Sequence, residues 1–191
     1  MDGAHMNDRL DDRRNKRISK YVARHLRHDP GRIGLTMDGH GWVDIDELVA
    51  AAARDGFRFT REELAEVVAR NDKRRFSVDG ERNRIRANQG HTIDVDLDLP
   101  VAEPPPYLFH GTVGRRVAGI RRDGLRAMGR HDVHLSPDRE TAGAVGARRG
   151  EPVVLVVDAG AMRRDGHEFR VSENGVWLVT YVPPEYIRFP G

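Results

Sequence analysis

Basic side chains that could bind an anion lie at two places in the first half of the chain. Arg27 and His28 end a predicted helix shortly before Pro30, and Arg75 belongs to the basic cluster 73–76. Guanidinium and imidazole groups are well suited to bind phosphate. Each cluster also has an ordinary interpretation. Cations near a helix C-terminus meet the negative end of the helix dipole, and charged residues on strands oppose edge pairing.

Polar residues that could contact a second ligand lie in the latter half of the chain. His110, Gly111 and Thr112 are predicted to connect a strand to a helix. In that position Gly111 would allow a ligand to approach the backbone closely, and Thr112 would cap the helix. A further polar group surrounds the next predicted strand, and it comprises Arg130, His131, His134 and Ser136.

The histidine spacing does not favour a metal site. His131 and His134 are three residues apart, so on a strand they would face opposite sides. The chain has no cysteine and no obvious third ligand, and we expect no metal. The absence of cysteine also excludes a disulfide framework and a thiol nucleophile. Further along, Asn-Gly at 174–175 predicts a turn before an apolar strand that begins at Val176.

Composition indicates a folded protein with a local anion site. The chain has 191 residues, which at about 100–200 residues per domain predicts one ordinary domain or two small ones. Its 32 basic and 30 acidic residues give a net charge of +2, too small for a broad electrostatic footprint. Three basic residues are lysine and 29 are arginine. A GC-rich genome explains that ratio as well as phosphate binding does.

The first half has the plan of a winged helix. A helix is predicted over 9–28, with an apolar stripe, and further helices over 45–54 and 61–70, each opened by a capping-box pattern. A hairpin follows, with strands over 75–78 and 84–87. The segment 1–8 is expected to be a tag remnant and a disordered start, because Gly-Ala-His-Met at 3–6 resembles a cloning scar.

The second half predicts an α+β unit. A linker is expected over 93–106, where alternating aspartates suggest a partial edge strand and three prolines follow. Short strands are predicted over 107–110, 133–135, 153–158, 168–171, 176–182 and 186–189, and helices over 114–122, 137–148 and 159–164. Regular βαβ alternation and a GxGxxG motif are both absent, so a Rossmann-type NAD site is not expected. The proposed boundaries are therefore 9–92 and 107–191.

Seven segments, taken in order, closely resemble the KptA-like RNA 2′-phosphotransferase family. The resemblance runs from about Ile18 to the C-terminus. Its motifs are LRHDP (26–30), GWVD (41–44), KRRF (73–76), IRANQGH (85–91), LFHGT (108–112), HDVHLS (131–136) and NGVWL (174–178).

The resemblance implies an N-terminal winged-helix RNA-binding lobe and a C-terminal ADP-ribosyltransferase-like lobe that binds NAD. It implies transfer of an internal RNA 2′-phosphate to NAD⁺ through an ADP-ribosylated RNA 2′-phosphate. The products would be RNA with a 2′-hydroxyl, nicotinamide and ADP-ribose 1″,2″-cyclic phosphate. NAD would be consumed as a cosubstrate, no metal would be needed, and the partner would be a tRNA-like RNA with an internal 2′-phosphate.

The resemblance also implies roles for particular residues. The essential tetrad of the family matches Arg27, His28, Arg75 and Arg130. The expected NAD contacts are His110, Gly111, Thr112, His134, Ser136 and Val176. Among these, His110, His134 and Val176 match a His-His-hydrophobic trio that stands in place of a catalytic glutamate.

Two alternatives stay open. The chain could be an ADP-ribosyltransferase that modifies terminal phosphates of nucleic acids and stops after the first step. It could also be a non-catalytic winged-helix module that binds RNA, which would give no heat with NAD⁺. We expect a cytoplasmic protein without a membrane span, because no secretion signal and no apolar run of about 18 residues are found. We also expect a monomer, because two small cores would use the apolar residues.

Overall fold

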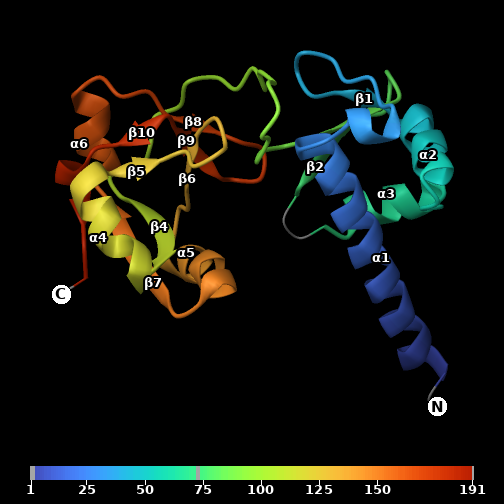
Figure 1. Ribbon diagram of the computed structural model, residues 1–191, viewed down its shortest axis with the longest axis horizontal. Coiled ribbons are helices and arrows are strands. Elements are labelled where there is room, and N and C mark those ends of the chain that lie inside the picture. Colours follow the sequence, from blue (N-terminus) through green and yellow to red (C-terminus); the bar gives the residue numbers. More distant parts are fainter. Residues whose placement is uncertain (1–2, 72–73, 191) are drawn as a thin grey trace. The chain divides into compact units, whose positions relative to one another are not determined.

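The structure is a computed structural model that describes residues 3–71 and 74–190. The chain divides into two compact units, Met1–Asp98 and Leu99–Gly191 (Figure 1). The division falls within the segment 93–106, for which a linker was expected. Lys73, from the predicted basic cluster, lies outside the described residues. None of the described helices is both long and apolar enough to cross a membrane.

The described residues of unit 1 form three α-helices, one short 3-10 helix and a three-stranded antiparallel sheet with the order β1-β3-β2. Asp44 caps the second helix by accepting hydrogen bonds from the Asp46 and Glu47 amides, and Thr60 forms a full capping box with Glu63 at the third. The elements are α1 (Gly3–Arg27), η1 (Gly31–Ile33), β1 (Val43–Asp44), α2 (Ile45–Arg54), α3 (Arg61–Ala69), β2 (Phe76–Asp79) and β3 (Arg84–Ala87).

Helix α1 is longer than predicted. It begins at Gly3, whereas the sequence predicted a helix that starts at residue 9. The sequence explains the extension, because no proline and no further glycine interrupts the segment between Gly3 and Ile18. Figure 1 shows the N-terminal turns of α1 extending beyond the rest of unit 1. Ile18, Val22 and Leu26 are fully buried and join this helix to the core of the unit.

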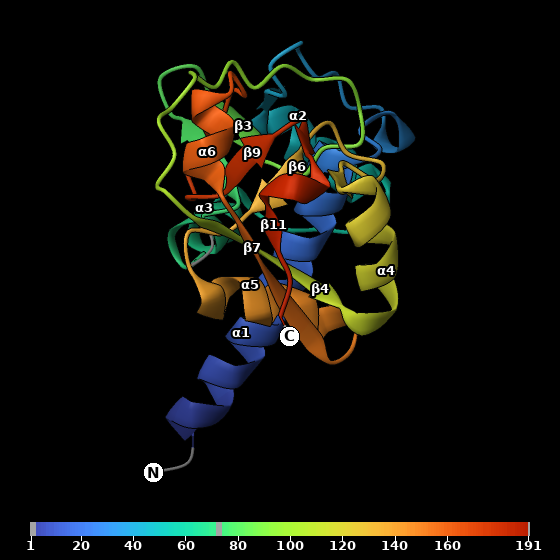
Figure 2. The same ribbon diagram turned by 90° about the vertical axis from the view of Figure 1, so that its left-hand side faces the viewer.

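Unit 2 is built from three small sheets, ordered β11-β7-β4, β6-β9-β8 and β10-β5. Strand β4 joins two of these sheets, because it pairs with β7 along one edge and Phe109 bridges to Ser136 on the other. Figure 2 shows β4 and β7 with α5 beside them. The strands are β4 (Leu108–Val113), β5 (Leu125–Arg126), β6 (Val133–Leu135), β7 (Pro152–Val157), β8 (Arg170–Val171), β9 (Trp177–Val179), β10 (Tyr181–Val182) and β11 (Ile187–Arg188). The helices are α4 (Gly114–Asp123), α5 (Arg139–Gly146), η2 (Ala147–Arg149), α6 (Ala159–Arg164) and η3 (Pro184–Tyr186).

A strand and a helix flank the HGT motif as predicted, but the turn and the Thr112 cap expected between them are wrong. Strand β4 continues through Gly111 and Thr112 to Val113, where the ladder with β7 pairs Thr112 with Val153. Thr112 is buried, and the N-cap of α4 is Val113, whose side chain makes no capping hydrogen bond. Threonine and valine favour strands, and an available partner strand outweighed the turn signal of glycine.

Two further strand predictions need correction. Residues 94–99 form no strand in the described structure, and Asp98 has a φ of 50°, which ends any extended run. Their alternation reflects half-buried Val95 and Leu97 between exposed aspartates. The strand predicted over 176–182 divides at Thr180 into β9 and β10, which belong to different sheets.

Candidate functional site

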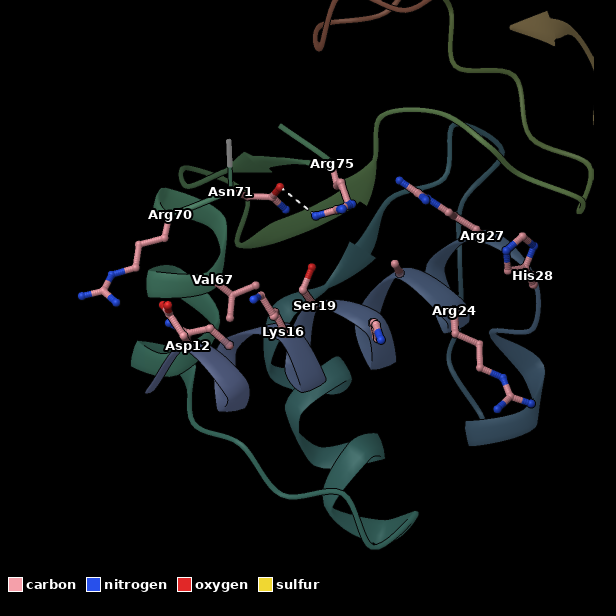
Figure 3. Close-up of a pocket in the computed structure, with 13 residues that line it drawn as sticks. Asp12, Lys16, Ser19, Arg24, Arg27, His28, Val67, Arg70, Asn71 and Arg75 are labelled. Atoms are coloured by element: carbon pink, nitrogen blue, oxygen red, sulfur yellow. Dashed lines mark hydrogen bonds between the residues drawn. The ribbon is translucent and has the colours of Figure 1, made fainter. Parts of the chain in front are cut away.

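Three residues of the predicted tetrad line one groove in unit 1. Arg27, His28 and Arg75 border a cavity of about 710 Å³ between α1, α3 and the start of β2. In Figure 3 the side chain of Arg27 extends from the end of α1 toward Arg75, whose guanidinium is turned to Asn71, while His28 lies beyond Arg27. The structure thus brings these three cationic or polar groups to one surface.

The segment after the hairpin holds the end of α1 in place. The Thr92 amide donates to the Arg27 carbonyl at 2.9 Å, and Thr92 Oγ1 is hydrogen-bonded to His28 Nδ1 at 3.1 Å. Gly90 has a φ of 88°, and a side chain there would begin 3.8 Å from the Arg27 guanidinium. Arg27 is half-buried as a result, so its guanidinium is held against the segment rather than moving freely in solvent.

Asn88 positions the backbone of Arg75. The Asn88 amide donates to the Arg75 carbonyl at 2.9 Å, and Asn88 Nδ2 donates to the Arg74 carbonyl at 2.7 Å. Asn88 is only 4% exposed. The side chain of Arg75 is oriented by Asn71, which follows α3, because Arg75 Nη1 donates to Asn71 Oδ1 at 3.1 Å. Two asparagines therefore fix the backbone and the guanidinium of this arginine.

A second cluster of predicted residues forms within unit 2. His110 on β4 donates from Nδ1 to the His134 carbonyl on β6 at 3.1 Å. Arg130 Nη1 donates to His134 Nδ1 at 3.0 Å. Because a carbonyl only accepts and a guanidinium only donates, His110 carries its proton on Nδ1 and His134 accepts at Nδ1. The pair of imidazoles therefore has defined tautomers.

The electrostatic surroundings keep His110 neutral. Burial lowers the pKa of His110 below its usual value of 6.5, the hydrogen bond to His134 opposes that shift, and the positive charges of Arg149 and Arg116 reinforce it. Desolvation of the guanidinium and the charge of Arg149 also lower the pKa of Arg130. Arginine stays protonated at neutral pH in any case. Arg130 and Arg149 thus add positive charge around the two histidines.

The remaining expected NAD contacts lie beside these histidines. Ser136 and Phe109 exchange two backbone hydrogen bonds, at 2.8 and 2.9 Å, which places Ser136 next to β4. Val176 directly precedes Trp177 of β9, which pairs with Leu135, the residue before Ser136. Both residues therefore neighbour the cluster of Arg130, His110 and His134.

Gly111 has a packing role that the sequence did not predict. A Cβ atom at Gly111 would lie 1.8 Å from the Ala142 carbonyl oxygen, so helix α5 packs directly on this part of β4. The missing side chain therefore allows a helix, rather than a ligand, to approach on that side.

Comparison with known proteins decides the family. The model of the "RNA 2′-phosphotransferase, Tpt1 / KptA family" matches residues 13–181. A relative from Streptomyces coelicolor named "Probable RNA 2′-phosphotransferase" is 68% identical over 93% of this chain and 96% of its own length. Relatives of the same name from Burkholderia pseudomallei and Trichormus variabilis are 57% and 49% identical, over 92% and 94% of this chain and 95% and 98% of their own lengths. The chain belongs to the RNA 2′-phosphotransferase family.

The residues expected for this family of transferases fall into two sets. Arg27, His28 and Arg75 belong to unit 1, whereas Arg130 and the expected NAD contacts belong to unit 2. The described residues contain no group of three or more His, Cys, Asp or Glu side chains that could hold a metal ion. Each unit therefore brings together the expected residues that belong to it.

The residues that position these sets had no role assigned to them from the sequence. Asn71, Asn88 and Thr92 orient the unit 1 groups, and Arg149 acts on both His110 and Arg130. The only available signal was the polar run after the hairpin, which is equally typical of an ordinary turn. Arg149 had no signal, because its relation to His110 arises from tertiary structure.

Proposed function

We propose that this member of the RNA 2′-phosphotransferase family removes an internal 2′-phosphate from RNA, with NAD⁺ as a consumed cosubstrate. Unit 1 would be a winged-helix RNA-binding lobe and unit 2 an ADP-ribosyltransferase-like NAD-binding lobe. The products would be 2′-hydroxyl RNA, nicotinamide and ADP-ribose 1″,2″-cyclic phosphate. The observation that carries the proposal is the convergence of Arg27, His28 and Arg75 on one groove in a member of this family.

The unit 1 groove suits a phosphomonoester. Such a group has close to two negative charges at neutral pH and presents three strong acceptor oxygens. Arg27 and Arg75 are permanent cations, and their guanidiniums supply several donors in a fixed geometry. His28 adds an imidazole at the end of the groove. In our proposal Arg130 of unit 2 acts on the same phosphate.

The unit 2 cluster suits the ribose and amide groups of NAD⁺. Neutral His110 has its proton on Nδ1, so its Nε2 accepts a hydrogen bond. His134 accepts at Nδ1 from Arg130, so in its neutral form its Nε2 donates. The two imidazoles therefore offer one acceptor and one donor for hydroxyl groups. Gly111, Thr112, Ser136 and Val176 would complete the NAD site.

The chemistry that follows needs no general base for the first step. The attacking 2′-phosphate is already anionic, and it displaces nicotinamide from the anomeric carbon of the ribose. The ribose 2″-hydroxyl then attacks phosphorus and loses its proton. The bond from phosphorus to the RNA 2′-oxygen breaks, and that oxygen takes up a proton and leaves as a hydroxyl. Arg27, Arg75 and Arg130 would stabilise the charge that redistributes over the phosphate oxygens in that second step.

Product analysis tests the proposal. A short RNA with one internal 2′-phosphate is incubated with the protein, with and without NAD⁺ and without added metal. We expect NAD⁺-dependent conversion to 2′-hydroxyl RNA and release of the cyclic phosphate. RNA that stays ADP-ribosylated would instead support the transferase that stops after one step. Unchanged RNA with NAD⁺ present would contradict the proposal and favour a binding module.

A further inference from the structure

Lysine is distributed unevenly in this chain. Only three of the 32 basic residues are lysine, and they are Lys16, Lys20 and Lys73. Lys16 and Lys20 both line the groove that contains Arg27 and Arg75. Lys73 lies outside the described residues. A chain that uses arginine almost everywhere thus has two of its three lysines on this surface.

Lys16 and Lys20 lie on the same face of α1 as Arg27, the first residue of the tetrad. Lys16, Lys20, Ala23 and Arg27 follow one another at intervals of four, three and four residues, and all four line the groove. This spacing keeps them on one face of a helix. At 1.5 Å per residue, the stripe leads over about 16 Å from Lys16 to Arg27. Figure 3 shows Lys16 and Ser19 on α1 between Asp12 and Arg27.

The charges of these lysines are available to a ligand. Some arginines of unit 1 are paired with a carboxylate, as Arg14 is with Glu63 at 2.9 Å and Arg70, which lines the groove, is with Glu66 at 3.1 Å. Lys16 and Lys20 are exposed and form no ion pair with a described residue. Among the described residues that line the groove, Asp12 alone is acidic. The groove therefore complements a polyanion.

The wall of the groove favours a nucleic-acid backbone over a protein. Along the stripe it presents Asn15, Ser19 and the small Ala23, with Val67 as the larger apolar residue. Hydroxyl and amide groups bind phosphate and sugar oxygens. Lysine is a compact charge on a flexible stem, which suits successive phosphates that need no fixed geometry.

We propose that Lys16 and Lys20 bind backbone phosphates of the RNA strand that flanks the 2′-phosphorylated nucleotide. The strand then follows α1 and presents its 2′-phosphate to Arg27 at the end of the groove. This inference rests on the proposed function, which supplies the RNA substrate, and extends it to the path of the strand.

The small number of lysines permits a direct footprint. The folded full-length protein is treated with an acetylating reagent, with and without RNA that has one 2′-phosphate and several nucleotides on each side, and without NAD⁺. Modification of each lysine and of the N-terminal amine is quantified by mass spectrometry. We expect the RNA to protect Lys16 and Lys20 while the terminal amine serves as an internal reference. Equal modification with and without RNA would overturn the proposal.

Matched variants separate the path from a general charge effect. Lys16→Gln and Lys20→Gln remove one positive charge each. Arg17→Gln is the control, because it removes the same charge from a residue that does not line the groove. The Arg17 guanidinium lies 5.8 Å from the Phe57 ring centre. RNA affinity measured by fluorescence anisotropy should fall roughly three- to fivefold for each lysine variant. The slope of log affinity against log salt should fall by about 0.7 each. Lys16→Arg should retain binding.

The outcomes also separate this inference from the proposed function. If the protein binds RNA through the lysines but never consumes NAD⁺, the path of the RNA strand along α1 is supported and the proposed reaction is rejected. Normal turnover with no effect of either lysine variant on binding would reject the path alone. A lysine effect no larger than that of Arg17→Gln would likewise reject it.

Discussion

The two candidate surfaces of this protein use basic residues in opposite ways. In unit 1 the groups are guanidiniums and lysines on an open groove of about 710 Å³, where Arg27 and Arg75 keep their charge at any physiological pH. In unit 2 the central groups are imidazoles, of which His110 is held neutral by burial. The first arrangement fits a dianion that arrives from solvent. The second fits a ligand recognised through hydroxyl and amide groups.

The supports of the two surfaces differ as well. Asn71, Asn88 and Thr92 hold the unit 1 groups from segments beside them. The two histidines of unit 2 are instead held by strands β4 and β6, which meet at Phe109 and Ser136. A side chain in unit 1 can therefore be displaced alone, whereas a change in unit 2 disturbs the sheet itself.

The largest expected effect tests this division of labour. Arg27→Ala should lower turnover of 2′-phosphorylated RNA by about 10²–10³-fold, the typical loss for one donor that stabilises transition-state charge. The affinity for NAD⁺, measured by calorimetry, should stay unchanged, because Arg27 belongs to unit 1. Arg54→Ala, an exposed arginine outside the groove, is the control. Equal losses in both variants would contradict the division.

Gly111→Ala should show how closely unit 2 is packed. The new methyl group meets the Ala142 carbonyl, so α5 must move away from β4. Overpacking of this kind lowers the free energy of unfolding by about 1–3 kcal/mol. Gly114→Ala is the matched control, since nothing lies within 4 Å of a Cβ there. Urea denaturation of both variants gives the comparison, and a stability equal to that of the wild type at position 111 would contradict the packing.

Asn88→Asp should weaken the support of Arg75 in unit 1 without affecting unit 2. The substitution removes the Nδ2 donor to the Arg74 carbonyl and puts a carboxylate in a buried position. We expect the free energy of unfolding to fall by about 1–3 kcal/mol. Because the backbone of Arg75 is then less well held, KM for the RNA should rise while the affinity for NAD⁺ does not change. A lower affinity for NAD⁺ with unchanged KM for RNA would refute this role.

The smallest effect concerns pH. The pKa of His110 is lowered in the folded state, so below its usual value of 6.5 the unfolded chain takes up a proton that the folded one resists. Stability should therefore fall as the pH drops from about 7 to about 5. In His110→Gln this part of the loss should disappear. Urea unfolding at both pH values measures this loss of stability. An equal loss in the wild type and in the variant would show that His110 does not contribute to it.

Local sequence signals predicted much of the fold but few of the residues that position the candidate site groups. Capping residues correctly placed the start of α2 at Asp44 and of α3 at Thr60. The error at Gly111 and Thr112 arose because a turn signal is local, whereas the pairing with β7 and the approach of α5 are not. The motif match named the groups Arg27, His28 and Arg75 that line one groove. It contained Asn88 but gave that residue no role, and it did not include Asn71.

The release of nicotinamide tests the central claim most directly. The protein is mixed with NAD⁺ and with two RNAs that differ only in a single internal 2′-phosphate, and nicotinamide and 2′-hydroxyl product are quantified together. The account predicts equal amounts of both, and only from the phosphorylated RNA. No nicotinamide release, or equal release with the unphosphorylated RNA, would contradict the pairing of a phosphate-binding unit with an NAD-binding unit.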